Sequence, residues 1–275
     1  QGDILGGDID VDAAEFANSG ELSGRTLEVS SLQLDNSGVI VIEGALDLAV
    51  AEVMNTGSIV GRGVNVDSLS LYNEGAISGQ SIHLQSEKTD NQGLLSFSQG
   101  LINTTQLRNG GDIQFDSGML QTKTILNSGR IEASQLTIDS LVFENTGGIA
   151  SNLLYLNSES LQNSGDLQFT KTEIEAVDII NDGDILGADV AIKVSEFENR
   201  GAVVGETVFI HSTTLRNDNL ISSDVLNLVS QETLNSGQIV FDQGNVSGET
   251  LRNDGEISGR GLKSSVLDSF NDGSI

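Results

Sequence analysis

The chain has 275 residues, with 40 acidic and 13 basic side chains and a formal net charge of −27. This charge argues against binding to nucleic acid or to anionic membrane surfaces, since both require clustered lysine and arginine. Membrane insertion is not expected either, because no apolar run approaches the roughly 18 residues that a span needs. The absence of cysteine excludes a disulfide framework, and the absence of proline suits a chain built almost entirely of paired strands.

Asparagine recurs along the whole chain with a nearly fixed period. Successive asparagines of this series are 18 residues apart, except for one step of 19 from Asn36 to Asn55. Glycine follows two residues after each of them, with Asn219 as the exception, and Leu, Ile or Val follows four residues after. A period of this size indicates a solenoid. The series comprises Asn18, Asn36, Asn55, Asn73, Asn91, Asn109, Asn127, Asn145, Asn163, Asn181, Asn199, Asn217, Asn235, Asn253 and Asn271.

Between two asparagines the apolar residues fall into three short alternating stretches. Counted from the asparagine, the first stretch begins four residues on, as at Leu22. The second carries apolar residues nine and eleven residues on, as at Leu27 and Val29, and the third has one two residues before the next asparagine, as at Leu34. Period-two alternation indicates strands, and no stretch has the 3.6-residue period of a helix.

The sequence therefore predicts an all-β fold, a parallel β-helix with three short strands in each 18-residue coil and about 15 coils. Residues 1–275 are expected to form a single array. The extra residue of the long coil should lie between Ile40 and Leu46. The position six residues after the asparagine mixes small and large residues, and a few polar residues interrupt the third apolar column, namely Thr89, Thr233 and Ser269.

The Asn-x-Gly motif is expected to form a corner of the coil. Glycine would supply a backbone with positive φ, which it reaches without steric cost, and Asn219 would fit because asparagine tolerates that region best among the other residues. The repeated asparagines should stack into a column in which each side-chain amide donates to one neighbour and accepts from the other. Turn chemistry alone would explain the glycine but not an unbroken asparagine column.

The pattern Leu-x-Asn-x-Gly-x-Ile followed by Leu-x-Leu, as in "LYNEGAISGQSIHL" (71–84) and "LRNDGEISGRGLKS" (251–264), resembles the haemagglutinin repeat of filamentous haemagglutinin and related two-partner-secreted exoproteins. The resemblance covers essentially the whole chain. It implies a right-handed β-helix that forms the shaft of an exported bacterial adhesin or contact-dependent toxin-delivery filament. The repeats of that family are slightly longer than 18 residues. Left-handed helices also use 18-residue coils, but no six-residue subrepeat is present here.

The inward pattern continues to both ends of the sequence, so the chain is expected to be an excerpt of a longer solenoid. Its partners would be neighbouring coils of the same longer chain or copies of itself, and a host-cell or bacterial surface receptor is a further candidate. The resemblance implies an extracellular location at the bacterial cell surface.

Catalytic signals are weak, and no catalytic or cofactor-binding residue is predicted. The two histidines, His83 and His211, are about seven coils apart, so they cannot share a metal, and both should face outward or lie at corners. Glycan-cleaving β-helices use paired carboxylates in clefts built by loops that interrupt the period. The only interruption here is one residue long.

Acidic residues flank the Asn-x-Gly corners of the late coils and are the one candidate for a ligand. Stacked carboxylates repel one another, so Ca²⁺ would help, although a solvated acidic surface is the favoured interpretation. Arg200 is expected between Asp182 and Asp218, and Arg130 next to Asp112. The acidic residues are Asp182, Asp184, Asp218, Asp254, Glu256 and Asp272.

Taken together, these features predict a non-catalytic structural shaft. The alternatives are a self-assembling fibre or sheath and a carbohydrate-binding β-helix, with a polysaccharide-degrading enzyme as the third class.

Overall fold

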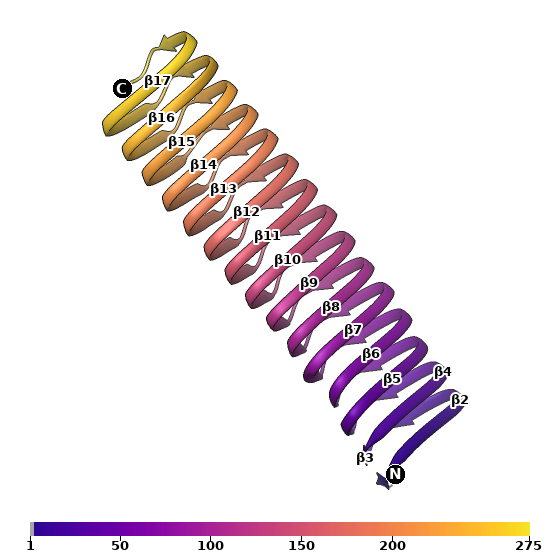
Figure 1. The fold of residues 1–275 in the computed structure, drawn as a ribbon. Coiled ribbons are helices and arrows are strands. Elements are labelled where there is room, and N and C mark those ends of the chain that lie inside the picture. The colour runs from indigo at the N-terminus through magenta and orange to yellow at the C-terminus, as the bar shows by residue number, and fades with distance from the viewer. Residues whose placement is uncertain (1–2) are drawn as a thin grey trace. The chain divides into compact units, whose positions relative to one another are not determined.

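A computed structural model describes residues 3–275, and in each of its two compact units the backbone forms a β-solenoid without helices. The units comprise residues 1–140 and 141–275. None of the described residues forms a helix that could span a membrane. Within each unit, successive coils stack in chain order and pair in parallel (Figure 1). This confirms the predicted all-β solenoid with coils of about 18 residues.

The first unit contains β1 to β9, and β10 contains the boundary between the units. The bounds are β1 (Ile4–Leu5), β2 (Asp8–Asn18), β3 (Glu21–Gly24), β4 (Thr26–Asn36), β5 (Val39–Asn55), β6 (Ser58–Asn73), β7 (Ala76–Asn91), β8 (Leu94–Asn109), β9 (Asp112–Asn127) and β10 (Arg130–Asn145). The second unit continues with β11 (Gly148–Asn163), β12 (Asp166–Asn181), β13 (Asp184–Asn199), β14 (Ala202–Asn217), β15 (Leu220–Asn235), β16 (Gln238–Asn253) and β17 (Glu256–Asn271).

The strands differ from the prediction of three separate short strands in each coil. From β6 onward each coil is one continuous strand of 16 residues that ends at its asparagine. The pairing of β12 with β13 nevertheless falls into three stretches, which on β12 are residues 166–169, 171–176 and 178–181. Thr170 and Val177 have no partner in this register. The backbone thus stays extended through two of the corners, and only one residue at each leaves the ladder.

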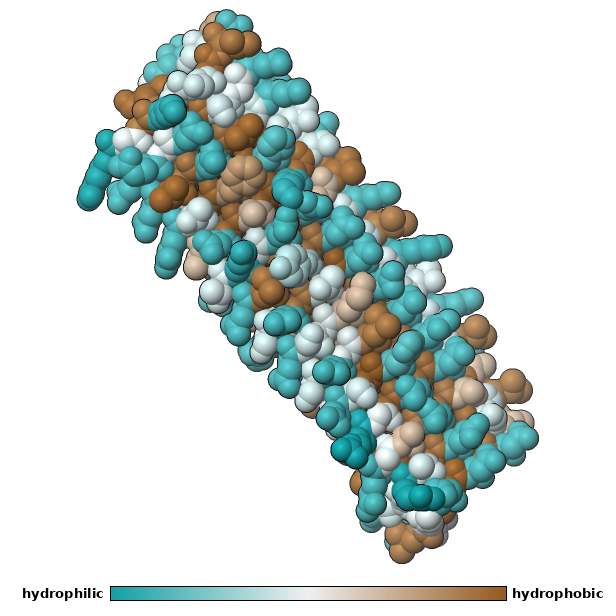
Figure 2. Space-filling model, viewed as in Figure 1, coloured by the Kyte–Doolittle hydropathy of each residue, from teal (hydrophilic) through white to brown (hydrophobic). Residues whose placement is uncertain are grey.

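The apolar columns predicted from the sequence form the core. The residue four places after each repeated asparagine is buried from Leu22 to Ile257, with at most 2% of its surface exposed. Leu27, Val29 and Leu34 are also buried. Because alternate side chains of a strand point to opposite faces, this burial leaves the intervening residues at the surface. Figure 2 shows hydrophilic side chains over much of the visible surface, with hydrophobic ones scattered among them.

The long coil absorbs its extra residue as a local bulge. The register between β5 and β6 shifts between Ile42 and Ala45, which places the insertion at Glu43 and Gly44. Gly44 N donates to Arg25 O at 2.8 Å. The predicted interval between Ile40 and Leu46 is therefore confirmed, and pairing resumes beyond the bulge.

Large and small residues complement one another six residues after the asparagine. Phe169 occupies this position in β12 and is buried, and its partner in β13 is Gly187. A Cβ atom on Gly187 would overlap two ring carbons of Phe169. Phe241 likewise pairs with Gly259 of β17, where a Cβ atom would overlap its ring. Phe115 instead pairs with Phe97, and its ring lies against Gly118 of its own strand. The phenylalanine rings therefore fill volume that the neighbouring residue leaves empty.

This complementarity can be measured with a double-mutant cycle at Phe169 and Gly187. Gly187→Ala alone should destabilise the second unit because the new methyl group overlaps the ring. The same substitution should cost less in a Phe169→Leu background, giving a coupling free energy of about 1 kcal/mol or more. Denaturant unfolding of the four proteins measures it. Strict additivity would show that the ring moves aside without cost.

Candidate functional site

The asparagine column is the most regular polar feature of the chain. Asn181 Nδ2 donates to Asn199 Oδ1 at 2.8 Å, to Gly183 O at 3.0 Å and to Ala202 O at 3.3 Å, while Asn181 Oδ1 accepts from Asn163 Nδ2 at 2.8 Å. The side chain is fully buried. An amide has only two N–H groups, so one of them is shared between two acceptors. Every polar atom of this buried side chain is thus paired.

The same ladder bond recurs along each unit. Amide-to-amide bonds of 2.7–2.8 Å link the asparagines consecutively from Asn18 to Asn127 in the first unit. In the second unit they run consecutively from Asn145 to Asn271. The ladder predicted from the sequence is therefore present within both units.

The backbone of each asparagine also holds the corner. Asn163 O accepts hydrogen bonds from Asp182 N at 2.7 Å and from Gly183 N at 3.0 Å, both in the following coil. The equivalent pair at Asn55 comes from Glu74 N and Gly75 N, at 2.8 and 3.0 Å. One residue type thus satisfies side-chain and backbone groups at the turn that separates successive strands from β6 onward.

The predicted role of the corner glycine is wrong. Among the described residues the only positive φ is 158° at Gly248, which lies outside the Asn-x-Gly corner, and no residue other than glycine has a positive φ. What excludes a side chain is close stacking. A Cβ atom on Gly183 would overlap the carbonyl oxygen of Gly165 in the preceding coil and lie 2.7 Å from the carbonyl carbon of Ser164. Glycine is required because backbones approach closely here, which is its other common use.

Asn219 therefore does not fit the sequence-based explanation, since its φ is not positive. Its amide Nδ2 donates to Arg200 O at 3.1 Å. The next backbone bond, from Leu220 N to Gly201 O, measures 3.2 Å, compared with 3.0 Å for the equivalent bond from Ala202 N to Gly183 O. The corner at Asn219 thus accommodates a side chain without a left-handed backbone.

A second inward polar column was not predicted. Hydroxyl residues recur thirteen residues after the asparagine, and several donate to the backbone carbonyl two residues on. Ser158 Oγ bonds Ser160 O at 2.9 Å and Ser230 Oγ bonds Glu232 O at 2.7 Å. In β11 the hydrogen bond from Ser158 to Ser160 spans Glu159, the corner residue that has no partner in the ladder. The members are Ser31, Ser68, Ser86, Thr104, Thr122, Ser140, Ser158, Ser212 and Ser230.

The polar interruptions of the third apolar column behave differently from one another. Thr89 and Thr233 are buried, whereas Ser269 is exposed. Thr89 Oγ1 lies 2.8 Å from Ser86 Oγ, which in turn donates to Thr104 Oγ1 at 2.9 Å. The first interruption is therefore compensated by the hydroxyl column.

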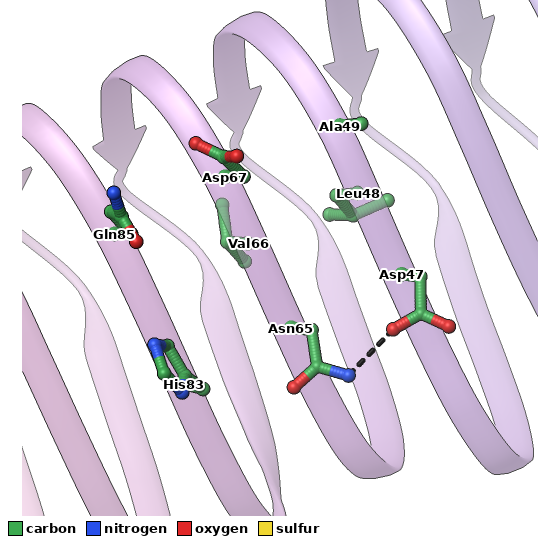
Figure 3. Close-up of a pocket in the computed structure, with 8 residues that line it drawn as sticks. All are labelled: Asp47, Leu48, Ala49, Asn65, Val66, Asp67, His83 and Gln85. Carbon is green, nitrogen blue, oxygen red and sulfur yellow. Dashed lines mark hydrogen bonds between the residues drawn. The ribbon is translucent and has the colours of Figure 1, made fainter.

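A shallow hollow lies on the outer face of β5 to β7 and contains His83 (Figure 3). Asp47, Asn65 and His83 follow one another in register along one side, and Asn65 Nδ2 donates to Asp47 Oδ1 at 2.5 Å. Ala49, Asp67 and Gln85 form the other side. His83 is exposed and makes no hydrogen bond to the other residues drawn in Figure 3. The hollow therefore offers polar contacts but no oriented acid–base pair.

The two histidines belong to different units, His83 to the first and His211 to the second. His211 is exposed on β14, where its ring stacks on that of Phe209 with centroids 6.4 Å apart and an interplanar angle of 28°. Both histidines face outward, as the sequence predicts.

Several of the acidic corners are paired with arginine. Arg200 lies 3.4 Å from Asp182 and 2.9 Å from Glu198, and Arg216 lies 2.7 Å from Asp218. Burial acts to raise the pKa of Asp218, but hydrogen bonds from Ser236 and Arg216 outweigh it and hold the pKa below its ordinary value. The predicted neighbourhood of Arg200 and Asp182 is confirmed.

Two further observations concern the charged surface. Arg130 forms its ion pair with Glu132, at 2.8 Å, rather than with Asp112. Over residues 3–275 no three His, Cys, Asp or Glu side chains gather closely enough to hold a metal ion. These ion pairs are exposed, so each contributes little to stability.

Comparison with models of known protein families, with characterised proteins and with solved structures gives no match. Function is therefore inferred from the geometry of the coil.

Proposed function

We propose that the chain is a non-catalytic structural shaft of a secreted bacterial surface adhesin or filament. The observation that carries this proposal is the recurrence of one set of corner hydrogen bonds in coil after coil of each unit, at Asn73 as at Asn181. Because the same hydrogen bonds recur at each corner, the buried polar groups of the chain serve to join one coil to the next.

The hydrogen bonds run from coil to coil, which is the direction that resists a force pulling the coils apart. Fourteen residue pairs join β12 to β13, and the bond from Asn181 to Asn199 adds a side-chain link to them. These interactions connect one coil to the next, so a force that separates coils acts on many bonds together. Each repeat of a solenoid is stabilised by its neighbours, which lets such arrays extend without a larger core.

The surface is consistent with a solvated, extended element outside the cell. The net charge of −27 opposes non-specific association and favours solubility. The resemblance of its Asn-x-Gly-x-Ile pattern to filamentous haemagglutinin-type repeats supports export by two-partner secretion. Under this proposal a binding or toxin activity resides elsewhere in the parent protein.

Removal of one whole coil tests the proposal. Deleting residues 182–199 from the parent protein joins Asn181 to Arg200 and Gly201, so the Asn-x-Gly corner is retained. We expect surface display and cell adhesion to stay within about twofold of the original, because repeats stack through nearest-neighbour contacts. Flow cytometry and an adhesion assay measure both.

A half-coil deletion of residues 182–190 is the matched control. It moves inward residues out of their columns, and display should fall sharply. Loss of adhesion on removal of a whole coil, with display unchanged, would contradict the shaft and identify a binding surface in the second unit. Repeating the whole-coil deletion at 56–73 extends the test to the first unit.

A further inference from the structure

Asn109 differs from every other asparagine of the ladder in the residue that follows it. Gly110 comes directly after Asn109, whereas the other fourteen are followed by Ser, Thr, Asp, Glu, Gln or Arg. In an Asn-Gly pair the backbone nitrogen of the glycine reaches the side-chain carbonyl carbon with little steric hindrance. This is the arrangement in which asparagine loses its amide most readily.

We propose that Asn109 is a site of spontaneous deamidation that the closed coil suppresses and that local opening releases. The Gly110 nitrogen loses its proton to solvent base and forms a bond to Asn109 Cγ. The Cγ–Nδ2 bond breaks, the leaving nitrogen takes back a proton from solvent and departs as ammonia, and a cyclic imide remains. Water then opens the imide at either carbonyl, and the product is aspartate or isoaspartate. Water is the only co-reactant.

Three features of the folded coil oppose this reaction. Asn109 Nδ2 donates to Asn127 Oδ1 at 2.8 Å, to Gly111 O at 3.1 Å and to Arg130 O at 3.2 Å, so the leaving group is held in place. Gly110 N, the attacking atom, donates to Asn91 O at 2.8 Å. The Asn109 side chain is fully buried, which excludes the water and base that the reaction consumes. All three features are lost together when this coil opens.

Neither aspartate nor isoaspartate can replace Asn109 in the hydrogen-bonded ladder. A carboxylate there would keep the bond from Asn91 Nδ2, which measures 2.8 Å, but it has no proton to donate. Three oxygens, those of Asn127, Gly111 and Arg130, would lose the hydrogen bond from residue 109 and face a buried negative charge instead, which is strongly unfavourable even though Gly111 O keeps its bond from Arg130 N at 2.9 Å. Isoaspartate would also lengthen the backbone by one atom within a coil of fixed period. Each opening that ends in reaction therefore leaves a permanent break at this coil.

The test compares deamidation in the folded chain and in denaturant. The intact chain is incubated at mildly alkaline pH in both conditions, and peptide mapping by mass spectrometry with enzymatic detection of isoaspartate follows each asparagine. In denaturant Asn109 should react about tenfold faster than any other ladder asparagine. In the folded chain it should react on the order of 100-fold more slowly, because only the open fraction reacts.

Gly110→Ser is the matched control variant. Serine occupies the equivalent position at Ser37 and Ser128, and a Cβ atom on Gly110 would meet only the flexible end of the exposed Gln92 side chain. The variant should fold normally and should lose the fast reaction in denaturant.

Equal rates at Asn109 in the folded and denatured chain would overturn the proposal, and so would a second ladder asparagine that reacts as fast in denaturant. Asn109→Asp supplies the product directly. Hydrogen exchange of the variant should quicken in coils 91–130, and unchanged protection there would contradict the permanent break. None of these outcomes depends on the proposed shaft function.

Discussion

Replacing Asn181 by alanine is expected to loosen the second unit around residues 163–202 by roughly 2–4 kcal/mol. The substitution removes the donors to Asn199 Oδ1, Gly183 O and Ala202 O and the acceptor for Asn163 Nδ2. Asn199 Oδ1 would be left buried without its partner, and the missing side chain would leave a cavity. Hydrogen exchange by mass spectrometry should show faster exchange in β12 to β14.

Asn152→Ala is the matched control, because Asn152 is an exposed asparagine outside the ladder in the same unit. It should leave exchange unchanged throughout. If both substitutions have equally small effects, the ladder bonds contribute little to stability and the asparagine column needs another explanation.

Gly183→Ala is expected to cost about 3 kcal/mol or more, a large effect for one methyl group. The new Cβ atom would overlap Gly165 O and lie 2.9 Å from Gly165 N, and both are backbone atoms of the coil below. Relief requires the two coils to separate, which lengthens the corner bonds from Asp182 N and Gly183 N to Asn163 O. Thermal unfolding and hydrogen exchange at 163–183 report the change.

Gly148→Ala separates this effect from the general cost of changing a glycine. Gly148 also lies near a corner of the second unit, but a Cβ atom on it would meet no other atom within 4 Å. It should be neutral or slightly stabilising, because alanine restricts the unfolded chain more than glycine does. A large loss in both variants would indicate that the glycines serve a conformational need rather than close stacking.

Much of the fold could be predicted from the sequence because one period governs it. The columns headed by Leu22, Leu27 and Leu34 are inward in both the prediction and the structure. The position of the bulge also followed from the sequence, since the columns shift by one residue between Ile40 and Leu46. In both cases the buried positions recur at the same offset from the asparagine in each coil, so the pattern of one coil supports the assignment of the next.

The corner glycine shows where such reasoning fails. A column of glycines indicates that side chains are excluded, but a positive φ and a close backbone approach both exclude them. Only the positions of the Gly165 backbone atoms beside Gly183 distinguish the two causes. Asn219 was misleading for the same reason, because its presence suits a left-handed backbone, yet its φ is not positive.

The hydroxyl column was missed because apolar residues interrupt it. Val50, Ala176 and Val194 occupy the same inward position as Ser158 and Ser230, so the column looks like variable core filling. Counting hydroxyl residues at each offset from the asparagine would have revealed it. The contact of Phe169 with Gly187 was detectable in the same way, since the two residues are one period apart.

Buried asparagine amides join successive coils, and exchange of their side-chain amide protons tests this role most directly. In ¹⁵N-resolved NMR spectra the Nδ2 protons of interior ladder residues such as Asn73 and Asn181 should exchange slowly, together with the backbone amides of their strands. The exposed amides of Asn103 and Asn152 should exchange rapidly. If the ladder protons exchange as fast as those of Asn103 and Asn152, the asparagine side chains are open to solvent and do not join the coils.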